Sequence, residues 1–219
     1  MRTAPHHRAF TLVELLVTIG ILALLVSLLL PMAKTWNAGA QTVSCSNNLR
    51  QMFLYLDAYA RENNGVYPAV SDATTGNSWW LTLQNYINTP SQVVGIRKRT
   101  IFLCPASLRT YPNQTARRTY GMNCEGLKND QGVLDWRTPI RPISQSRLSS
   151  TLFIADTCNG PANNGDGYQY FRATASPAFT DVVEARHSGR ANALFLDGHV
   201  ELIDPKAPES LDKVKNLGQ

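Results

Sequence analysis

Apolar residues are concentrated in one uninterrupted run near the start of the chain. The run Leu15–Ala33 contains no charged residue and is bounded by Glu14 and Lys34. A helix of that length spans about 29 Å, roughly the thickness of a bilayer hydrocarbon core. The pattern predicts a membrane-spanning helix, and Arg2 and Arg8 predict that the segment before it stays cytoplasmic.

After Pro31 the apolar residues recur with a helical period on one face only. They comprise Trp36, Ala40, Val43, Leu49, Met52, Phe53, Leu56 and Ala60. Such a stripe predicts a helix that buries one face against a core. The sequence Asn63-Asn64-Gly65 predicts its end, and Pro68 supports that boundary. We expect one helix over residues 10–63, transmembrane over 10–33 and amphipathic over 34–63.

The remaining residues, 64–219, predict a head built mainly from short strands. A second helix is expected over 79–87, and strands over 101–103, 151–155, 168–173, 182–186, 191–196 and 199–203. Asp197-Gly198, between the last two strands, is a strong hairpin signal. Residues 107–142 have weak periodicity and predict irregular structure. The predicted fold class is α+β, with a long N-terminal helix packed on a C-terminal antiparallel sheet.

Charge and known motifs add little to this picture. The chain of 219 residues carries a net charge of +5, part of which comes from Arg2 and Arg8. Basic clusters at 97–99 and 117–118 lie near Tyr111 and Tyr120, whose rings could stack on single-stranded nucleic acid. No known binding module surrounds them, so a nucleic-acid partner is not expected. The sequence shows no P-loop, dinucleotide fingerprint or nucleophile elbow, and an enzyme is not expected.

The start of the apolar run carries a specific motif. The sequence Ala9-Phe10-Thr11-Leu12-Val13-Glu14 closely resembles the processing site of type IV pilins and type II secretion pseudopilins. The resemblance implies that a prepilin peptidase cuts between Ala9 and Phe10 and methylates the new amino terminus, so that residues 1–9 are a leader. An ordinary signal peptide is disfavoured, because a polar helical pattern follows the run instead of a cleavage site.

Two further residues match the same family. The resemblance implies that Glu14 meets the amino terminus of a neighbouring subunit, which would neutralise both charges inside an apolar bundle. Pro31 lies at the distance from Phe10 where many pilins carry a proline. The resemblance thus assigns Glu14 and Pro31 to assembly of the helix into a filament.

The C-terminal part contains a second resemblance. His187, nine further residues and then Asp197-Gly198 resemble the H-X9-DG element of many pilin-like proteins. An acid–base pair of His187 and Asp197 is not expected. If 182–187 paired with 191–196, these residues would lie at opposite ends of a hairpin, about 17 Å apart. We predict that Asp197-Gly198 forms a turn and that His187 bonds to its own loop.

Cysteines and a glycine-rich loop are the remaining candidate sites. Cys45, Cys104, Cys124 and Cys158 permit two disulfides in an exported head, a zinc site, or free buried thiols. Asp156 and Asp166 flank a loop rich in Asn and Gly, a weak calcium candidate because its spacing does not match an EF-hand. No other metal or cofactor is expected.

These observations favour a structural subunit over a binding protein or an enzyme. The resemblance implies a prepilin or pseudopilin that is processed by prepilin peptidase and assembled with other subunits into a type IV pilus-like or type II secretion filament. It implies a single-pass protein of the bacterial inner membrane, with the head periplasmic or extracellular. The alternatives are a membrane-anchored binding protein that does not polymerise and, last, an anchored hydrolase that uses His187 or His199.

Overall fold

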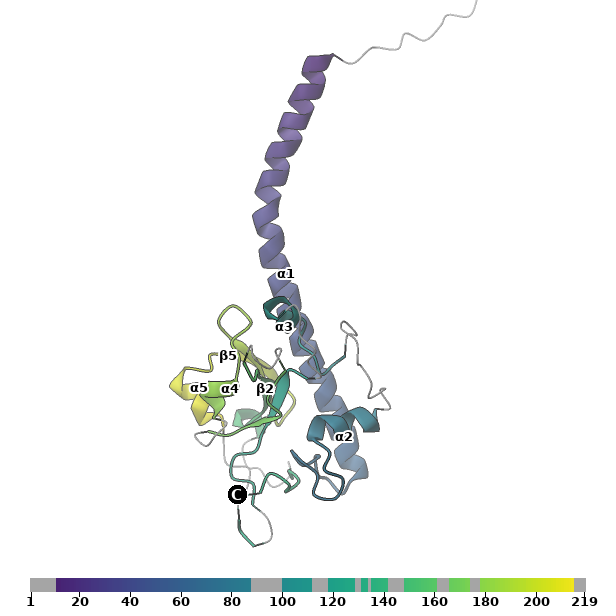
Figure 1. Cartoon of the computed structure of the whole chain (residues 1–219), viewed down its shortest axis with the longest axis vertical. Coiled ribbons are helices and arrows are strands. Elements are labelled where there is room, and N and C mark those ends of the chain that lie inside the picture. The colour runs from purple at the N-terminus through teal and green to yellow at the C-terminus, as the bar shows by residue number, and fades with distance from the viewer. Residues whose placement is uncertain are drawn as a thin grey trace, which may run out of the picture. The chain divides into compact units, whose positions relative to one another are not determined.

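The computed structural model describes residues 11–87, 100–111, 118–128, 131–133, 135–141, 148–160, 166–173 and 178–214, without the side chains of 31–35. The chain forms two compact units, Met1–Gly39 and Ala40–Gln219. Its helices are α1 (Leu12–Glu62), α2 (Trp79–Tyr86), α3 (Pro105–Thr110), α4 (Phe179–Val182) and α5 (Pro208–Asp212), with a 3-10 turn η2 at Leu148–Ser150. Its strands are β1 (Tyr120–Asn123), β2 (Leu152–Asp156), β3 (Tyr170–Phe171), β4 (Ala191–Phe195) and β5 (Val200–Ile203) (Figure 1).

The first unit consists of the N-terminal part of α1. The segment Leu12–Leu30 has a mean hydropathy of 2.7 and is long and apolar enough to cross a membrane, judged by length and composition. Its large apolar side chains are all exposed, from 51% at Leu25 to 74% at Leu12. The predicted apolar helix is therefore present, and the described residues of its own unit leave its apolar side chains uncovered.

The C-terminal part of α1 belongs to the second unit and has one buried face. Leu49, Met52 and Leu56 are completely buried, and Ala60 is nearly so. The sequence extended this stripe back to Trp36, but Ala40 and Val43 are exposed. The buried stripe within this unit begins at Cys45, where the segment carrying Cys104 is bonded to the helix.

The head contains one five-stranded sheet of order β3-β1-β2-β4-β5. The pairs β1–β2, β2–β4 and β4–β5 are antiparallel, whereas β1–β3 is parallel. The sheet is therefore mixed, whereas the sequence predicted an antiparallel sheet. The parallel pair is short, joining Met122 to Tyr170 and Asn123 to Phe171.

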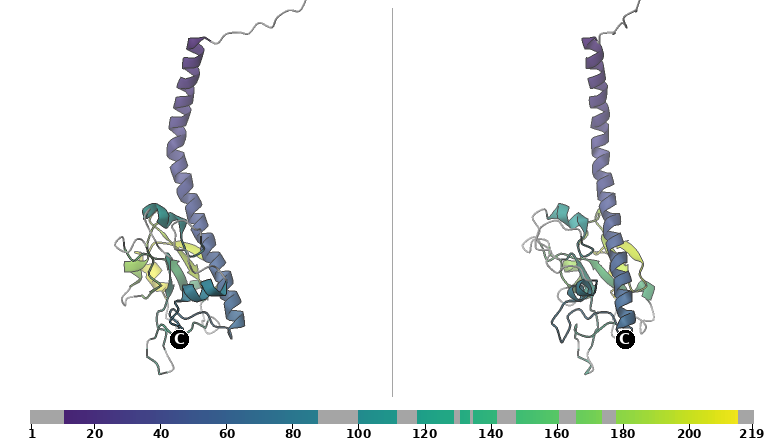
Figure 2. Two further views of the ribbon diagram at one scale, coloured as in Figure 1. Left: turned by 45° about the vertical axis from the view of Figure 1, so that its right-hand side comes forward. Right: turned by 90° about the vertical axis from the view of Figure 1, so that its right-hand side faces the viewer.

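Both faces of the strands β1, β2 and β4 are buried, whereas the edge strand β5 is partly exposed. Along β4, Leu194 packs in the core that contains the α1 stripe, while Ala193 and Phe195 pack in a second core with residues of α4. Side chains of a strand alternate between its faces, so one continuous apolar strand can supply both cores. The view in Figure 2 shows α2 beside the end of α1, where Tyr59 and Tyr86 meet edge-on at 5.5 Å.

Several predicted elements were located correctly and others were wrong. The strands expected at 151–155, 191–196 and 199–203 and the helix expected at 79–87 are present, and their ends differ from the expected ones by at most one residue. The strand expected at 101–103 is a turn, and the one expected at 182–186 is replaced by α4 and a single bridge from Val183 to Thr157. Strand β1 lies inside the stretch expected to be irregular, because its pairing with β2 and β3 compensates for weak local periodicity.

Candidate functional site

Glu14 caps the helix on which it lies. Its Oε2 atom accepts hydrogen bonds from the backbone nitrogen and the hydroxyl of Thr11, each at 2.9 Å. In return, the Thr11 hydroxyl accepts a bond from the Glu14 backbone nitrogen at 3.2 Å. This reciprocal arrangement is a capping box, which satisfies two backbone donors that have no partner within the helix. It explains why α1 begins at Leu12.

The expected cleavage site precedes the part of the chain that the structure describes. Ala9 and Phe10 lie outside the described residues. Pro31 lies within α1, and the helix runs through it without interruption. The leader 1–9 and the implied cleavage between Ala9 and Phe10 stay predictions.

His187 is placed by a tight turn in front of β4. Ser188 and Gly189 both have positive φ angles, 53° and 83°, and the His187 and Arg190 backbones bond to each other across the turn. Two successive positive φ angles are the signature of a two-residue hairpin turn that follows the twist of its flanking strands. The turn directs the imidazole into the protein, where only 4% of the residue is exposed.

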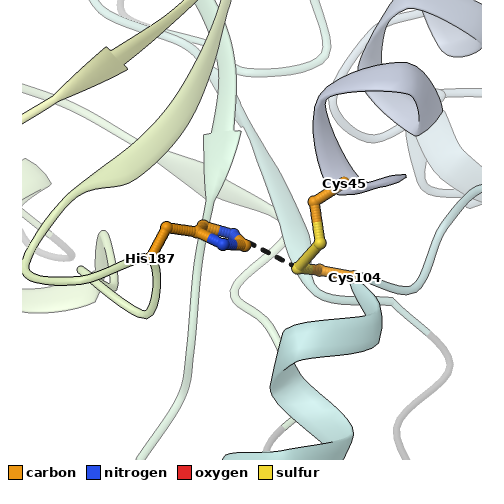
Figure 3. A group of neighbouring side chains, drawn as sticks. All are labelled: Cys45, Cys104 and His187. Atoms are coloured by element: carbon orange, nitrogen blue, oxygen red, sulfur yellow. Dashed lines mark hydrogen bonds between the residues drawn. A yellow bond between two sulfur atoms is a disulfide. The ribbon is translucent and has the colours of Figure 1, made fainter. Parts of the chain in front are cut away.

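Both ring nitrogens of His187 have partners from distant segments, and Figure 3 shows the contact with Cys104. Nε2 lies 3.1 Å from Asp156 Oδ2 and 3.3 Å from Cys104 Sγ, while Nδ1 lies 3.1 Å from Thr42 Oγ1. A tautomer that carries its proton on Nε2 donates to Asp156 and accepts at Nδ1 from Thr42. The predicted bond of His187 to its own loop is therefore wrong for the ring, which ties together α1, β2 and the segment before α3.

Asp156 is completely buried at the end of β2. Its Oδ2 atom also accepts from the backbone nitrogen of Asn192 at 2.8 Å and from its side-chain amide at 3.3 Å. Its Oδ1 atom is buried, without a hydrogen-bond partner in the part of the chain that the structure describes. The Oδ2 atom of Asp156 is thus engaged by His187 and Asn192, and calcium binding in the loop that follows stays a prediction. Asp166 instead approaches Arg118 at 3.7 Å, and 161–165 lie outside the described residues.

Two of the four cysteines form a disulfide and two are free thiols. Cys45 and Cys104 form a buried disulfide that joins α1 to the N-terminus of α3. Cys124 and Cys158 are free and buried, so the second permitted disulfide does not form. Burial raises the pKa of the Cys124 thiol, whose sulfur contacts the Phe171 carbonyl at 3.5 Å. Cys158 lies 3.2 Å from the hydroxyl of Tyr111.

Asp156, His187 and Cys104 have the composition of an Asp–His–Cys catalytic group, but the disulfide removes the nucleophile that such a group needs. Cysteine acts as a nucleophile through its thiolate, and Cys104 is bonded to Cys45. The disulfide sulfurs and the imidazole are also buried, which keeps a large substrate away from them. The arrangement is suited to holding segments together, and to binding a metal if the two thiols are reduced.

Asp197 and Gly198 form the turn between β4 and β5, as predicted. Asp197 Oδ1 bonds to His199 Nδ1 at 2.6 Å, and the His199 ring stacks on Phe195 at 4.2 Å. Gly198 has a φ of +90°, and an added Cβ would lie 2.5 Å from the Phe53 ring. Since His187 bonds to Asp156 and Asp197 bonds to His199, the structure does not bring the two ends of the element together.

Tyr111, Tyr120 and Arg118, considered above for stacking on nucleic acid, contact other residues of the head. Tyr120 is completely buried, and burial followed by the charge of Asp156 raises the pKa of its hydroxyl well above the usual value. Burial raises the pKa of Tyr111, which donates to Glu184 at 2.8 Å. Arg118 lies over the Trp80 ring at 5.3 Å. Residues 97–99 and 117 lie outside the described residues.

Sequence reasoning missed two parts of these sites. Thr11 could have been found, because Thr followed three residues later by Glu is the capping-box pattern. Thr42 and Asp156 as partners of His187 had no local signal. They lie on separate elements and meet the ring only through the packing of the head.

The comparison with known families concerns the start of the chain. Residues 5–30 match the prokaryotic N-terminal methylation motif. No curated protein and no solved structure matches the chain. The matched segment contains the cap at Thr11 and Glu14 and nearly all of the apolar span. The motif and the span together support a pilin-like or pseudopilin-like N-terminus that anchors the chain in a membrane, and a structural subunit in preference to an enzyme.

Proposed function

We propose that the chain is a prepilin-like structural subunit. A prepilin peptidase cuts it between Ala9 and Phe10, the span inserts into the bacterial inner membrane, and subunits assemble into a type IV pilus-like or type II secretion filament. The head faces the periplasm or the exterior. The observation that carries the proposal is the match of residues 5–30 to the methylation motif, on a helix whose apolar side chains are exposed.

The hydrophobic effect supports assembly through this helix. Burying a leucine side chain contributes roughly 1.5–3 kcal/mol, and Leu12–Leu30 exposes many such side chains along one continuous segment. A membrane covers them before assembly, and neighbouring copies of the same helix cover them in a filament. A subunit that moves from one environment to the other needs a helix apolar on all sides, as this one is.

Processing is tested by the mass of the mature amino terminus. We expect peptide mapping of the membrane fraction to find N-methyl-Phe10, and an uncleaved chain in cells that lack prepilin peptidase. An intact Met1 in cells with the peptidase, or a cut after Ala33, would contradict the proposal.

Two variants separate the role of Glu14 in assembly from its role in capping its own helix. In Glu14→Gln the side chain still accepts from Thr11, but its negative charge is lost. In Thr11→Val the carboxylate is kept, but the hydroxyl that accepts from Glu14 is lost. If Glu14 pairs with the amino terminus of a neighbour, Glu14→Gln should abolish filaments and Thr11→Val should keep them.

The two variants also distinguish the alternatives. Filaments that are lost in Thr11→Val and kept in Glu14→Gln would show that the cap alone matters. If neither variant changes the fraction of subunit in sheared filaments, and no filaments form in the wild type, the anchored binding protein becomes the better explanation. Membrane insertion measured in parallel controls for expression of each variant.

A further inference from the structure

Three side chains that bind metals meet in the interior of the head. The ligand atoms of Cys45, Cys104 and His187 lie within 4.8 Å of one another, and all three residues are buried (Figure 3). Cys45 comes from α1, Cys104 from the segment before α3, and His187 from the turn before β4. The three elements converge because each belongs to the packed head, so the group is built by the fold and not by a local loop.

The chemistry of this donor set is that of zinc. Zinc binds cysteine sulfur at about 2.3 Å and histidine nitrogen at about 2.0–2.1 Å, so ligand atoms around one ion lie roughly 3.5 Å apart. The His187 nitrogen is already 3.3 Å from Cys104 Sγ, whereas the two sulfurs are bonded to each other and must move apart after reduction to reach this spacing. Soft thiolates with imidazole in a tetrahedral site favour Zn²⁺ over hard cations such as Ca²⁺ or Mg²⁺.

Asp156 lies beside the histidine of this group. It is completely buried, its Oδ2 atom is 3.1 Å from Nε2 of His187, and its Oδ1 atom has no hydrogen-bond partner among the described residues. A buried carboxylate oxygen without a partner is costly, which makes this oxygen an independent indication that a cation can bind here. Oδ2 remains held by two donors from Asn192, which would fix the orientation of the carboxylate.

Thr42 would set the tautomer of the histidine. When Nε2 binds a metal, the proton moves to Nδ1, and Nδ1 lies 3.1 Å from the Thr42 hydroxyl oxygen. An outer partner of this kind on the second ring nitrogen is typical of histidines that bind zinc.

We infer that the reduced head binds one Zn²⁺ ion through Cys45 Sγ, Cys104 Sγ, His187 Nε2 and Asp156 Oδ1, and that zinc and the disulfide are alternative states of one site. Binding zinc releases the two thiol protons, because both sulfurs bind as thiolates. Oxidation by a disulfide-class oxidant removes two electrons from the two thiolates. The Sγ–Sγ bond forms, the zinc ion leaves, and the oxidant's own disulfide is reduced and takes two protons from solvent.

The test uses the full chain in detergent micelles, purified and kept under a non-chelating reductant. Titration with Zn²⁺ is expected to show one ion bound per reduced chain, and none in a preparation whose Cys45–Cys104 disulfide has formed. Cys45→Ser/Cys104→Ser should abolish uptake, and Asp156→Asn should weaken it at least about 10-fold, because loss of even an outer partner of a ligand weakens metal binding by about 10–100-fold. His187→Gln should weaken uptake more than Asp156→Asn.

Matched variants control for other thiols and histidines. Cys124→Ser/Cys158→Ser removes the two free cysteines, and His199→Gln removes the other histidine of the same region. Both should bind one ion with unchanged affinity. Zinc uptake that survives Cys45→Ser/Cys104→Ser, or that falls as much in His199→Gln as in His187→Gln, would overturn the inference. An unchanged affinity in Asp156→Asn would remove Asp156 from the site.

Two measurements on the wild-type chain do not depend on any variant folding. Replacement of zinc by Co²⁺ should give thiolate-to-cobalt charge-transfer bands and the intense visible bands of a tetrahedral ion. Oxidised glutathione added to the zinc-loaded chain should release one zinc ion, read with a chromophoric indicator, for each disulfide formed. The absence of thiolate–cobalt bands, or disulfide formation without zinc release, would overturn the inference.

Discussion

Helix α1 contains two apolar stretches that differ in how much of their apolar surface is exposed. Along Leu12–Leu30 the apolar residues surround the helix, and every large one is at least half exposed. Along Cys45–Ala60 most of them occupy one face and are buried in the core of the head, whereas Leu54 and Tyr55 are exposed. The first stretch therefore needs a partner outside its own chain, whereas the second has found its partner within the chain. The same hydrophobic effect supports assembly in one and folding in the other.

The largest effect should come from the covalent bond at the start of the second stretch. The disulfide joins cysteines separated by 59 residues, and closing a loop of that size is worth about 4 kcal/mol on the chain-entropy model. We expect Cys45→Ala/Cys104→Ala to lower the free energy of unfolding of the oxidised head by about that amount in urea denaturation. Cys124→Ala, which removes a free thiol, is the matched control.

Replacing one leucine in each stretch tests the comparison directly. Leu49 is completely buried, and truncating such a side chain costs about 3 kcal/mol from lost transfer energy and a cavity. Leu22 is 59% exposed, so Leu22→Ala should leave the unfolding of the head unchanged. Equal losses in the two variants, measured by urea denaturation in the same micelles, would break the comparison.

Two glycines test how closely the β4–β5 turn lies on the second stretch. Gly198→Ala places a Cβ against the Phe53 ring and forces alanine to a φ of +90°, so we expect a loss of about 2–3 kcal/mol. Gly189 has a similar φ of +83°, but no atom lies within 4 Å of an added Cβ. Gly189→Ala should cost only the backbone strain, roughly 1–2 kcal/mol. Thermal unfolding of both variants measures the difference, which is the contribution of the contact.

The last comparison concerns the dependence of stability on pH. The packed stretch has buried neighbours that ionise in alkali. Burial, aided by the charge of Asp57 on α1, raises the pKa of Tyr67 from 10.0 to about 12. Between these values the folded state holds the phenolic proton and the unfolded state loses it, so the stability is fully present below pH 10.0 and falls toward about pH 12.

Urea denaturation across this pH range should show that decline. In Tyr67→Phe the decline should be shallower, although Tyr120 and Cys124, whose pKa values are also raised by burial, keep part of it. An identical pH dependence in Tyr67→Phe and the wild type would show that Tyr67 does not retain its proton on folding. The Leu12–Leu30 stretch contains no tyrosine, cysteine or lysine and should not contribute.

The sequence predicted those features that depend on neighbours in the chain. The long helix follows from its apolar run and stripe, and the β4–β5 turn follows from Asp197-Gly198. Strand β1 and the parallel pair with β3 were missed, because their stability comes from residues far along the chain. The surroundings of His187 were missed for the same reason. Its three partners lie at positions 42, 104 and 156, and no spacing rule relates such distant residues.

The position of the Cys45–Cys104 disulfide has a mechanical consequence. A pull applied to α1 from its N-terminal side reaches Cys45 before it reaches Leu49 or Leu56 on the packed face. In the oxidised chain the load passes there into the head through a covalent bond, so the noncovalent contacts beyond it are not peeled apart one after another. In the proposed filament, tension would pass along α1 of each subunit. The disulfide links α1 covalently to the head at the position where that tension enters the head.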